Sequence, residues 1–404
     1  MRAVYSLIFA LVLLITCPGV VFSQGDVDYG DLLGQRALNP ITTAVPFLLI
    51  APDARGGALG DAGVSSSPDI NSMHWNPAKY AFMEQDMGFA VSYTPWLRTL
   101  VPDINLGYLT GYRRLDPLQT IAFSLKYFTL GDVNFTDDVG NYMGTVRPNE
   151  FSFDVAYARL LGDNLSGAIA ARFIYSDLTQ GQMAGGMETQ AGVSLAADVA
   201  AYYQRDLTWD TPTKFAAGVN ISNMGNKISY TDRINADFIP INLRFGPSLT
   251  FELDDFNEIA VMVDFNKLLV PTPPIYARDE NGQLIPTDDG WEIAEGRDPN
   301  RSVVAGMLGS FSDAPGGFQE ELNEFTISAG IEYWYDRQFA LRAGYFHEHE
   351  SKGNRKYFTV GVGLKYNVFG LDFAYLVPVA QRSPLENVLR FSLSFDLEAL
   401  QAGN

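Results

Sequence analysis

The chain has 404 residues and a formal net charge of -19, and 47% of its residues are hydrophobic and 13% aromatic. So acidic a chain repels phosphate backbones, which excludes nucleic acid as its partner. The length is enough for one large folded unit, and the aromatic content favours strands and the aromatic girdles of membrane barrels. The acidic residues cluster between apolar stretches, as is typical of solvated loops.

Residues 1–23 have the pattern of a secretory signal peptide. Arg2 precedes an apolar run from Leu7 to Ile15, and small residues lead to Ser23. The pattern predicts export and cleavage near Ser23. The single cysteine, Cys17, lies in this segment, so the mature chain would contain no disulfide. Acylation of Cys17, as in a lipoprotein, is the alternative, but its neighbours fit that processing poorly.

Residues 24–86 follow the signal and do not alternate in hydropathy. They are rich in proline and glycine and include the apolar stretch Ile41 to Ile50. If the strands that follow form an even-stranded membrane barrel, this segment starts on the periplasmic side and can fold up into the lumen of that barrel. We therefore predict an N-terminal plug. A disordered periplasmic leader is the alternative, which the apolar stretch disfavours.

From residue 87 to residue 397 the chain consists of segments of about ten residues in which apolar and polar side chains alternate. In residues 241–253, for example, Leu243, Phe245 and Leu249 share one face, whereas Arg244 and Ser248 share the other. Successive side chains of a strand point to opposite faces, so this period is typical of strands between lipid and lumen. Strands are predicted to begin near residues 87, 104, 119, 150, 165, 192, 213, 241, 257, 325, 339, 357, 371 and 388.

The connections between these strands alternate between short and long. Residues 162–164, 254–256 and 336–338 are tight, whereas 131–149 and 267–324 are long. A membrane barrel has short periplasmic turns and long external loops, and a soluble sandwich has no reason to alternate in this way. We predict an all-β fold: a transmembrane antiparallel β-barrel of about 14 strands over residues 87–397, with a C-terminal tail at 398–404. No apolar run after the signal reaches the roughly 20 residues of a spanning helix.

The longest loop, residues 267–324, is too long for a simple connection, so a partner-binding or gating role is predicted. Residues 303–311 within it are apolar enough for a short helix.

The sequence contains no strong catalytic, cofactor or metal motif. Its three histidines are His74, His347 and His349. His347 and His349 share the outer face of a strand end and are interpreted as a surface pair rather than a metal site. A hydrolase would need a serine with a histidine base and an orienting carboxylate, which only the surroundings of His74 could supply. We therefore predict a chain that is not an enzyme and has no cofactor.

Three stretches of the predicted plug resemble the PorV family. They are residues 42–55, 60–63 and 74–80, and the resemblance extends over the whole chain. PorV is an outer-membrane component of the type IX secretion system and belongs to the barrels similar to FadL, which have fourteen strands and an N-terminal plug. The motif residues that carry the resemblance are Pro52, Asp53, Arg55, Gly60, Asp61, Gly63, Asn76, Pro77 and Ala78.

The resemblance implies an integral protein of the bacterial outer membrane that receives cargo with a C-terminal signal domain. Its partners would be the translocon barrel, the cargo signal domains, the sortase-like surface attachment complex and outer-membrane lipids. The alternatives are a FadL-like transporter of hydrophobic molecules and a lipid A deacylase. For the last of these the sequence shows no supporting triad.

Overall fold

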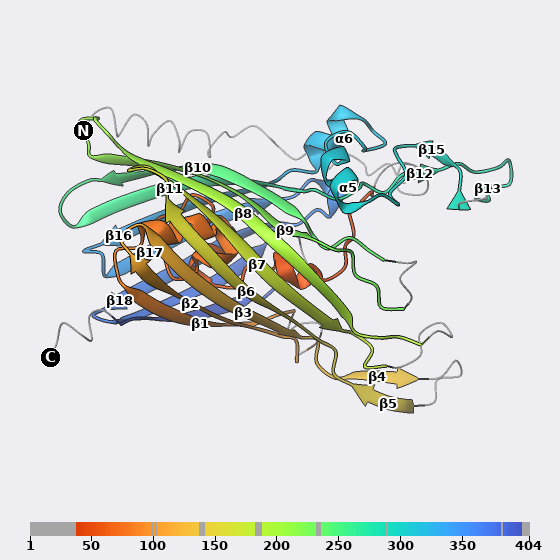
Figure 1. Cartoon of the computed structure of the whole chain (residues 1–404), viewed down its shortest axis with the longest axis horizontal. Coiled ribbons are helices and arrows are strands. Elements are labelled where there is room, and N and C mark those ends of the chain that lie inside the picture. Colours follow the sequence, from red (N-terminus) through yellow and green to blue (C-terminus); the bar gives the residue numbers. More distant parts are fainter. Residues whose placement is uncertain are drawn as a thin grey trace.

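The computed structural model describes residues 38–97, 101, 103–136, 142–181, 188–231, 236–287, 290–380 and 383–397. The predicted signal peptide, residues 24–37 of the predicted plug and the predicted C-terminal tail lie outside the described residues. Fourteen of the described strands form one closed barrel, shown in Figure 1. These strands are β1 (Met87–Pro95), β2 (Asn105–Asp116), β3 (Gln119–Thr129), β6 (Asn149–Leu160), β7 (Leu165–Asp177), β8 (Gly192–Leu207), β9 (Thr213–Gly225), β10 (Asn242–Glu252), β11 (Asn257–Leu268), β16 (Thr326–Tyr335), β17 (Phe339–His347), β18 (Lys356–Tyr366), β19 (Phe369–Pro378) and β20 (Leu389–Asp396).

The first and last strands close the barrel. β1 pairs antiparallel with β20 from Gly88 opposite Asp396 to Tyr93 opposite Phe391. The remaining barrel strands also pair antiparallel, each with the barrel strands that precede and follow it in the chain. Closure leaves no edge strand with unpaired backbone groups, which a hydrocarbon environment would not tolerate. All fourteen strands begin within two residues of the predicted positions, so the predicted barrel is confirmed.

Side chains along the barrel strands alternate between an exposed apolar row and a buried small or polar row. In β3, Ile121, Phe123 and Leu125 are exposed, whereas Ser124 and Lys126 are buried. The exposed row faces outward, where lipid tails would cover it, and the buried row lines the lumen. Among the described residues, no helix is both long and apolar enough to cross a membrane.

The start of β10 differs from the predicted pattern. Ile241 was predicted to share the outer face, but it precedes the strand and is buried against Ile239 and Leu269. Inside β10, Pro247 pairs with Ala217 of β9, whereas the register with β11 omits Gly246 and Pro247. Proline has no N–H to donate to a ladder, so the interruption lies where its ring is.

Short turns and long loops lie at opposite ends of the barrel. Between β16 and β17, Asp336 and Arg337 both have φ of 52°, the left-handed region typical of tight hairpin turns. The other end carries the loop elements, and α5 confirms the predicted apolar helix (Figure 1). They are β4 (Val133–Thr136), β5 (Tyr142–Val146), β12 (Ile275–Tyr276), β13 (Pro286–Thr287), β14 (Gly290–Trp291), β15 (Ile293–Glu295), α5 (Val303–Gly309), α6 (Phe318–Asn323) and η3 (Glu350–Lys352).

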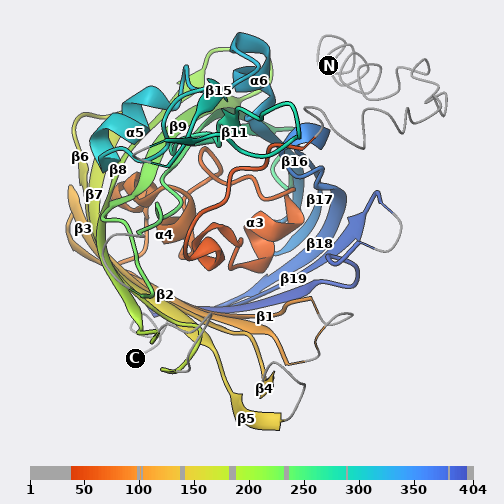
Figure 2. The same cartoon turned by 90° about the vertical axis from the view of Figure 1, so that its right-hand side faces the viewer.

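Residues 38–86, named the lumen segment from here on, contain four short helices surrounded by the ring of strands, as Figure 2 shows end-on. α3 contacts β17 to β20, whereas η2 contacts β3 and β6 to β8 on the other side of the ring. Several large side chains of the segment, including Trp75 and Tyr80, are fully buried. The four helices are η1 (Pro46–Leu49), α3 (Ala54–Ala58), α4 (Ser72–Trp75) and η2 (Pro77–Phe82).

Candidate functional site

The first motif residues begin α3. Pro52 is buried directly before the helix, and the Asp53 carboxylate accepts from the backbone N–H of Gly56 at 2.8 Å as its N-cap. The indole N–H of Trp75, in α4, donates to the other oxygen of Asp53 at 2.7 Å. Burial, aided by the charge of Asp69, raises the pKa of Asp53 to about 6. Asp53 therefore joins α3 to α4 inside the barrel.

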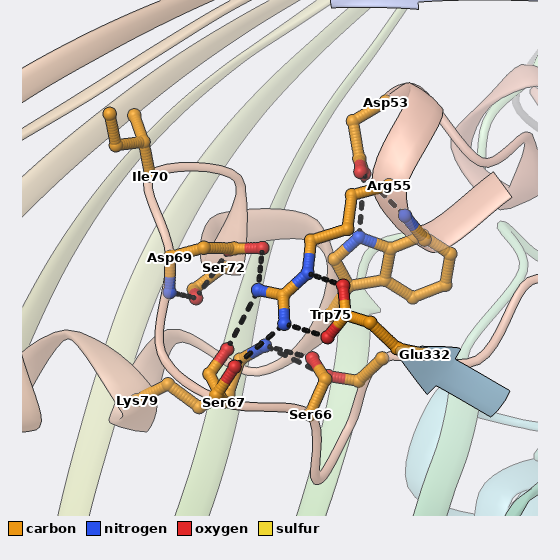
Figure 3. Close-up of polar contacts among 12 residues, drawn as sticks. Asp53, Arg55, Ser66, Ser67, Asp69, Ile70, Ser72, Trp75, Lys79 and Glu332 are labelled. Carbon is orange, nitrogen blue, oxygen red and sulfur yellow. Dashed lines mark hydrogen bonds and ion pairs between the residues drawn. The ribbon is translucent and has the colours of Figure 1, made fainter. Parts of the chain in front are cut away.

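Arg55 connects the lumen segment to the barrel wall (Figure 3). Its guanidinium binds the Glu332 carboxylate of β16 with two parallel hydrogen bonds of 3.0 and 2.7 Å. It also donates to Asp69 at 2.8 Å and to the Ser67 hydroxyl at 2.6 Å. Burial alone would raise the pKa of Asp69, but the charges of Lys79 and Arg55 lower it below its usual value. The fork-shaped pairing of Arg55 with Glu332 fixes the direction of the contact as well as its distance.

The ion pairs continue along the barrel wall. Arg342 of β17 donates to Glu332 at 2.7 Å and to Asp372 of β19 at 2.6 Å. The result is an alternating chain of charges, named the inner charge chain from here on. It consists of Asp69, Arg55, Glu332, Arg342 and Asp372.

A second attachment uses glycines that let two backbones touch. A Cβ at Gly344 of β17 would lie 2.0 Å from the backbone nitrogen of Gly60, and one at Gly330 of β16 would lie 2.8 Å from Leu59. Gly60 itself has φ of 71°, a conformation that L side chains rarely adopt. The Thr359 hydroxyl accepts from the Gly60 N–H at 2.9 Å. Glycine is thus required on both sides of this contact.

The next motif residues also bind the wall. The Tyr357 hydroxyl donates to Asp61 at 2.6 Å, and Arg390 lies 3.1 Å from the same carboxylate. The backbone N–H groups of Gly63 and Val64 donate to one oxygen of Asp264 at 2.7 and 2.9 Å. Asp264 belongs to the part of β11 whose ladder to β10 is interrupted.

The Asn76–Pro77–Ala78 triplet makes the turn between α4 and η2. The Asn76 side-chain amide donates to the carbonyls of Val64 and Ala201, both at 3.0 Å, and its oxygen accepts from the Ala78 N–H at 3.0 Å. Pro77 occupies the first turn of η2, where its missing N–H costs nothing. The nine motif residues therefore lie in one buried body, and each polar motif side chain bonds another part of the segment or the barrel.

The wall partners of the motif were not predicted from the sequence. Glu332, Asp264 and Thr359 contact the lumen segment, and Arg342 contacts Glu332, yet none of the four was singled out. One signal was available, because a charged residue on the inward row of a strand needs a partner inside the barrel.

His74, in α4, belongs to the lumen segment, and the described residues give it no catalytic partner. The Lys126 ammonium lies 3.2 Å from its Nδ1, and its Nε2 is buried without a hydrogen-bond partner among the described residues. Burial, followed by the charge of Lys126, holds the pKa of His74 well below 6.5. With no hydroxyl or carboxylate bonded to it in the described structure, His74 does not form the serine–histidine–carboxylate arrangement that a hydrolase would need.

The other two histidines lie apart from the lumen. His347 contacts the Tyr345 hydroxyl at 3.5 Å, and His349 caps η3 through Ser351. Among the residues that the structure describes, no three potential metal ligands are grouped.

Two cavities flank the lumen segment. The outer cavity, of about 440 Å³, is lined by residues 41–51 and by strand ends on the long-loop side, including Asn242, Thr326 and Tyr357. The inner cavity, of about 270 Å³, is lined by Arg55 and by residues of the short-turn side such as Arg337. The two share no lining residue, so the segment separates them.

Solved structures and family models place this geometry among known proteins. A deletion mutant of the monoaromatic hydrocarbon channel TodX (deltaS2S3) is 12% identical with a TM-score of 0.50, over 85% of this chain and 96% of that one. The Pseudomonas putida toluene transporter TodX is 11% identical with a TM-score of 0.48, over 89% of this chain and 98% of that one. No curated protein sequence matches the chain.

The first of these similarities supports a shared barrel fold. A family model described as type IX secretion system protein PorV matches residues 34–275, which is more than half of the chain and includes all nine motif residues. The chain is an outer-membrane β-barrel and belongs to the PorV family of type IX secretion system proteins.

Proposed function

We propose that this barrel is a non-catalytic cargo receptor of the type IX secretion system. It receives cargo with a C-terminal signal domain from the translocon barrel and carries it to the surface attachment complex. The observation that carries the proposal is the family match over residues 34–275 combined with a lumen filled by its own segment. A barrel plugged in this way cannot pass folded cargo, so cargo would be held at its outer face.

The long loop between β11 and β16 is the proposed cargo-binding element. Lys267 binds Glu324 and lies 3.0 Å from Glu321, and Lys352 lies 3.0 Å from the same Glu324. These buried pairs attach α6 to the barrel rim, so the loop is held in place. Beyond the attachment, Leu308 and Phe318 are 70% and 77% exposed. Exposed apolar groups on an anchored loop are typical of protein-binding surfaces.

The test replaces the outer part of this loop and keeps its attachment. Residues 275–300 are exchanged for a short Gly-Ser turn, and a second variant changes Leu308 and Phe318 to serine. Both leave Lys267 and Glu324 in place. We expect cargo to be lost from affinity purification in mild detergent, while the barrel still inserts and shows heat-modifiable mobility. Undiminished cargo recovery in both variants would contradict the loop's role.

We also propose that residues 1–23 direct export and are removed near Ser23. Residues 24–86 would then act as the plug, and residues 398–404 as a short tail. N-terminal sequencing of the protein purified from outer membranes tests the cleavage, because the mature chain would begin at Gln24.

Transport of hydrophobic molecules is the second candidate. The outer cavity has apolar wall residues, among them Leu49, Ile50 and Phe346, and the similar TodX structure is described as a hydrocarbon channel. Against it, the two cavities share no lining residue. Uptake of labelled toluene or fatty acid by liposomes containing the protein tests this candidate.

Deacylation of lipid A is tested with His74→Ala, whose activity should match that of the parent chain if His74 has no catalytic role.

A further inference from the structure

The floor of the outer cavity contains an arginine that forms no ion pair with any of the described residues. Arg244 of β10 is 8% exposed and lines the cavity. Its Nε donates to the Asn266 side chain at 2.6 Å, an Nη donates to the His74 carbonyl at 3.4 Å, and its Cζ lies 4.7 Å from the centre of the Trp75 ring. Among the described residues, no carboxylate lies within ion-pair distance of it. The groups that contact it directly are thus neutral, and Asp264, Asp61 and Asp53 act on its charge only from beyond ion-pair distance.

The other charged residues that line this cavity are all matched. Asp61 pairs with Arg390 at 3.1 Å, Glu348 with Arg355 at 2.7 Å, and Glu324 with Lys352 at 3.0 Å. Arg244 is therefore the one lining charge in the described structure that a ligand could neutralise without first breaking an ion pair.

A second cation lies behind the same floor. The Lys126 ammonium donates to the carbonyls of Leu48 and Ile50, both at 3.1 Å, and also contacts His74. It too has no carboxylate within ion-pair distance among the described residues. Two basic side chains that form no ion pair in the described structure thus lie at this floor, in a chain whose net charge is -19. Because buried charges favour a paired state, an anion entering the cavity would be held there.

We propose that the outer cavity binds the C-terminal carboxylate of a peptide chain, with Arg244 as the group that pairs with it. The inference rests on the proposed function, since cargo carries its signal at the C-terminus. The matched carboxylates Glu324 and Glu348 in the lining disfavour multiply charged anions such as phosphate. A volume of about 440 Å³ is within the usual range of ligand pockets and accommodates the last few residues of a chain.

The polar lining favours a peptide over a fatty acid. Asn242, Asn266, Thr42 and Thr326 line the cavity beside apolar residues such as Ile50. Peptide N–H and C=O groups need hydrogen-bond partners when they leave water, whereas a hydrocarbon chain needs none. Mixed amide, hydroxyl and apolar groups around one arginine are the chemistry that recognises an apolar peptide ending in a free carboxylate.

The test measures binding of a defined probe to the purified full-length protein in detergent. The probe is an N-terminally fluorescent pentapeptide of alanine, valine and leucine with a free C-terminal carboxylate, and its matched control has a C-terminal amide. We expect anisotropy to show the amide binding about tenfold to a hundredfold more weakly. Arg244→Gln should weaken the carboxylate form by the same factor and bring the two peptides to equal affinity.

Two further variants separate charge from folding. Arg337→Gln, on the exposed short-turn side, removes the same charge and should leave binding unchanged. Arg244→Lys keeps the charge without the planar fork and should bind with intermediate affinity. Heat-modifiable mobility confirms that each variant has folded. Equal binding of both peptides to the parent chain, or full binding to Arg244→Gln, overturns the proposal. Oleate that binds through Arg244 while the peptides do not also overturns it, in favour of a lipid site.

Recovery of intact cargo separates this inference from the proposed function. Cargo that co-purifies with a parent chain unable to bind either peptide refutes the cavity assignment alone. Carboxylate-dependent peptide binding without cargo recovery refutes the receptor role alone.

Discussion

The inner and outer ends of the lumen segment hold buried charges in opposite ways. At the inner end, the inner charge chain from Asp69 to Asp372 alternates in sign, and Glu332 binds two arginines. At the outer end, Arg244 and Lys126 are held by carbonyls, an amide and a ring, without a carboxylate within ion-pair distance in the described structure. A buried charge that is fully matched fastens two elements, whereas one that is left unmatched is available to a ligand.

The largest effect is expected where the inner charge chain is cut at its centre. Glu332→Gln leaves Arg55 and Arg342 buried without their shared carboxylate. Removing one partner of a buried ion pair typically costs about 3–5 kcal/mol. The free energy of unfolding, followed by tryptophan fluorescence in urea, should fall by that order. Asp336→Asn, in the exposed turn next to β16, is the control and should change little.

A double variant sharpens this result. Changing both Arg55 and Glu332 to methionine removes the pair together, and Arg342 keeps Asp372 at 2.6 Å. We expect it to be more stable than Glu332→Gln. A Glu332→Gln protein as stable as its control would show that the inner charge chain does not fasten the segment.

The next effect comes from the glycine contact near the inner charge chain. Gly344→Ala places a methyl group 2.0 Å from the Gly60 nitrogen, so one backbone has to move. Overpacking of this kind costs about 1–3 kcal/mol. Limited proteolysis should cut the lumen segment faster in this variant. Gly162→Ala, which has no heavy atom within 4 Å of the new methyl group, should behave as the parent chain does.

A pH effect is expected from the outer end. Burial and Lys126 hold the pKa of His74 well below 6.5, so the unfolded chain takes up a proton there before the folded chain does. The contribution of His74 to stability is therefore complete above pH 6.5 and is lost as the pH falls toward the lower folded-state pKa. The loss approaches about 1.4 kcal/mol per pH unit between the two pKa values. His74→Gln should reduce this slope in urea titrations from pH 7 to pH 5, and an unchanged slope would contradict the assignment.

The smallest effect is expected at Arg244 itself. Arg244→Gln removes a buried charge that has no ion pair, so the free energy of unfolding should stay within about 1 kcal/mol of the parent value or rise. Arg342→Gln, which breaks two buried pairs, should lower it by several times more. Equal losses for the two arginines would remove the contrast between the two ends.

The barrel itself could be predicted from the sequence because its signals are local. Alternation along β3 assigns each side chain to lipid or lumen without reference to any other strand. Turn residues such as Asp336 and Asn367 mark where adjacent strands connect. The error at Ile241 arose because burial under a loop and exposure to lipid both select an apolar residue, so hydropathy cannot distinguish them.

By itself, the sequence determined the strand count, the alternation of turns and loops and, through its resemblance to a family, the residues of the lumen motif. Only the tertiary structure decided what those residues contact. Arg55 and Glu332 are 277 positions apart, and closure of the barrel by β1 and β20 brings such distant residues around one lumen. The unmatched state of Arg244 likewise depends on which carboxylates the fold brings near it. Such pairs between distant residues form only when the barrel closes. All fourteen strands together set the circumference of the barrel, and that circumference decides which side chains meet in the lumen.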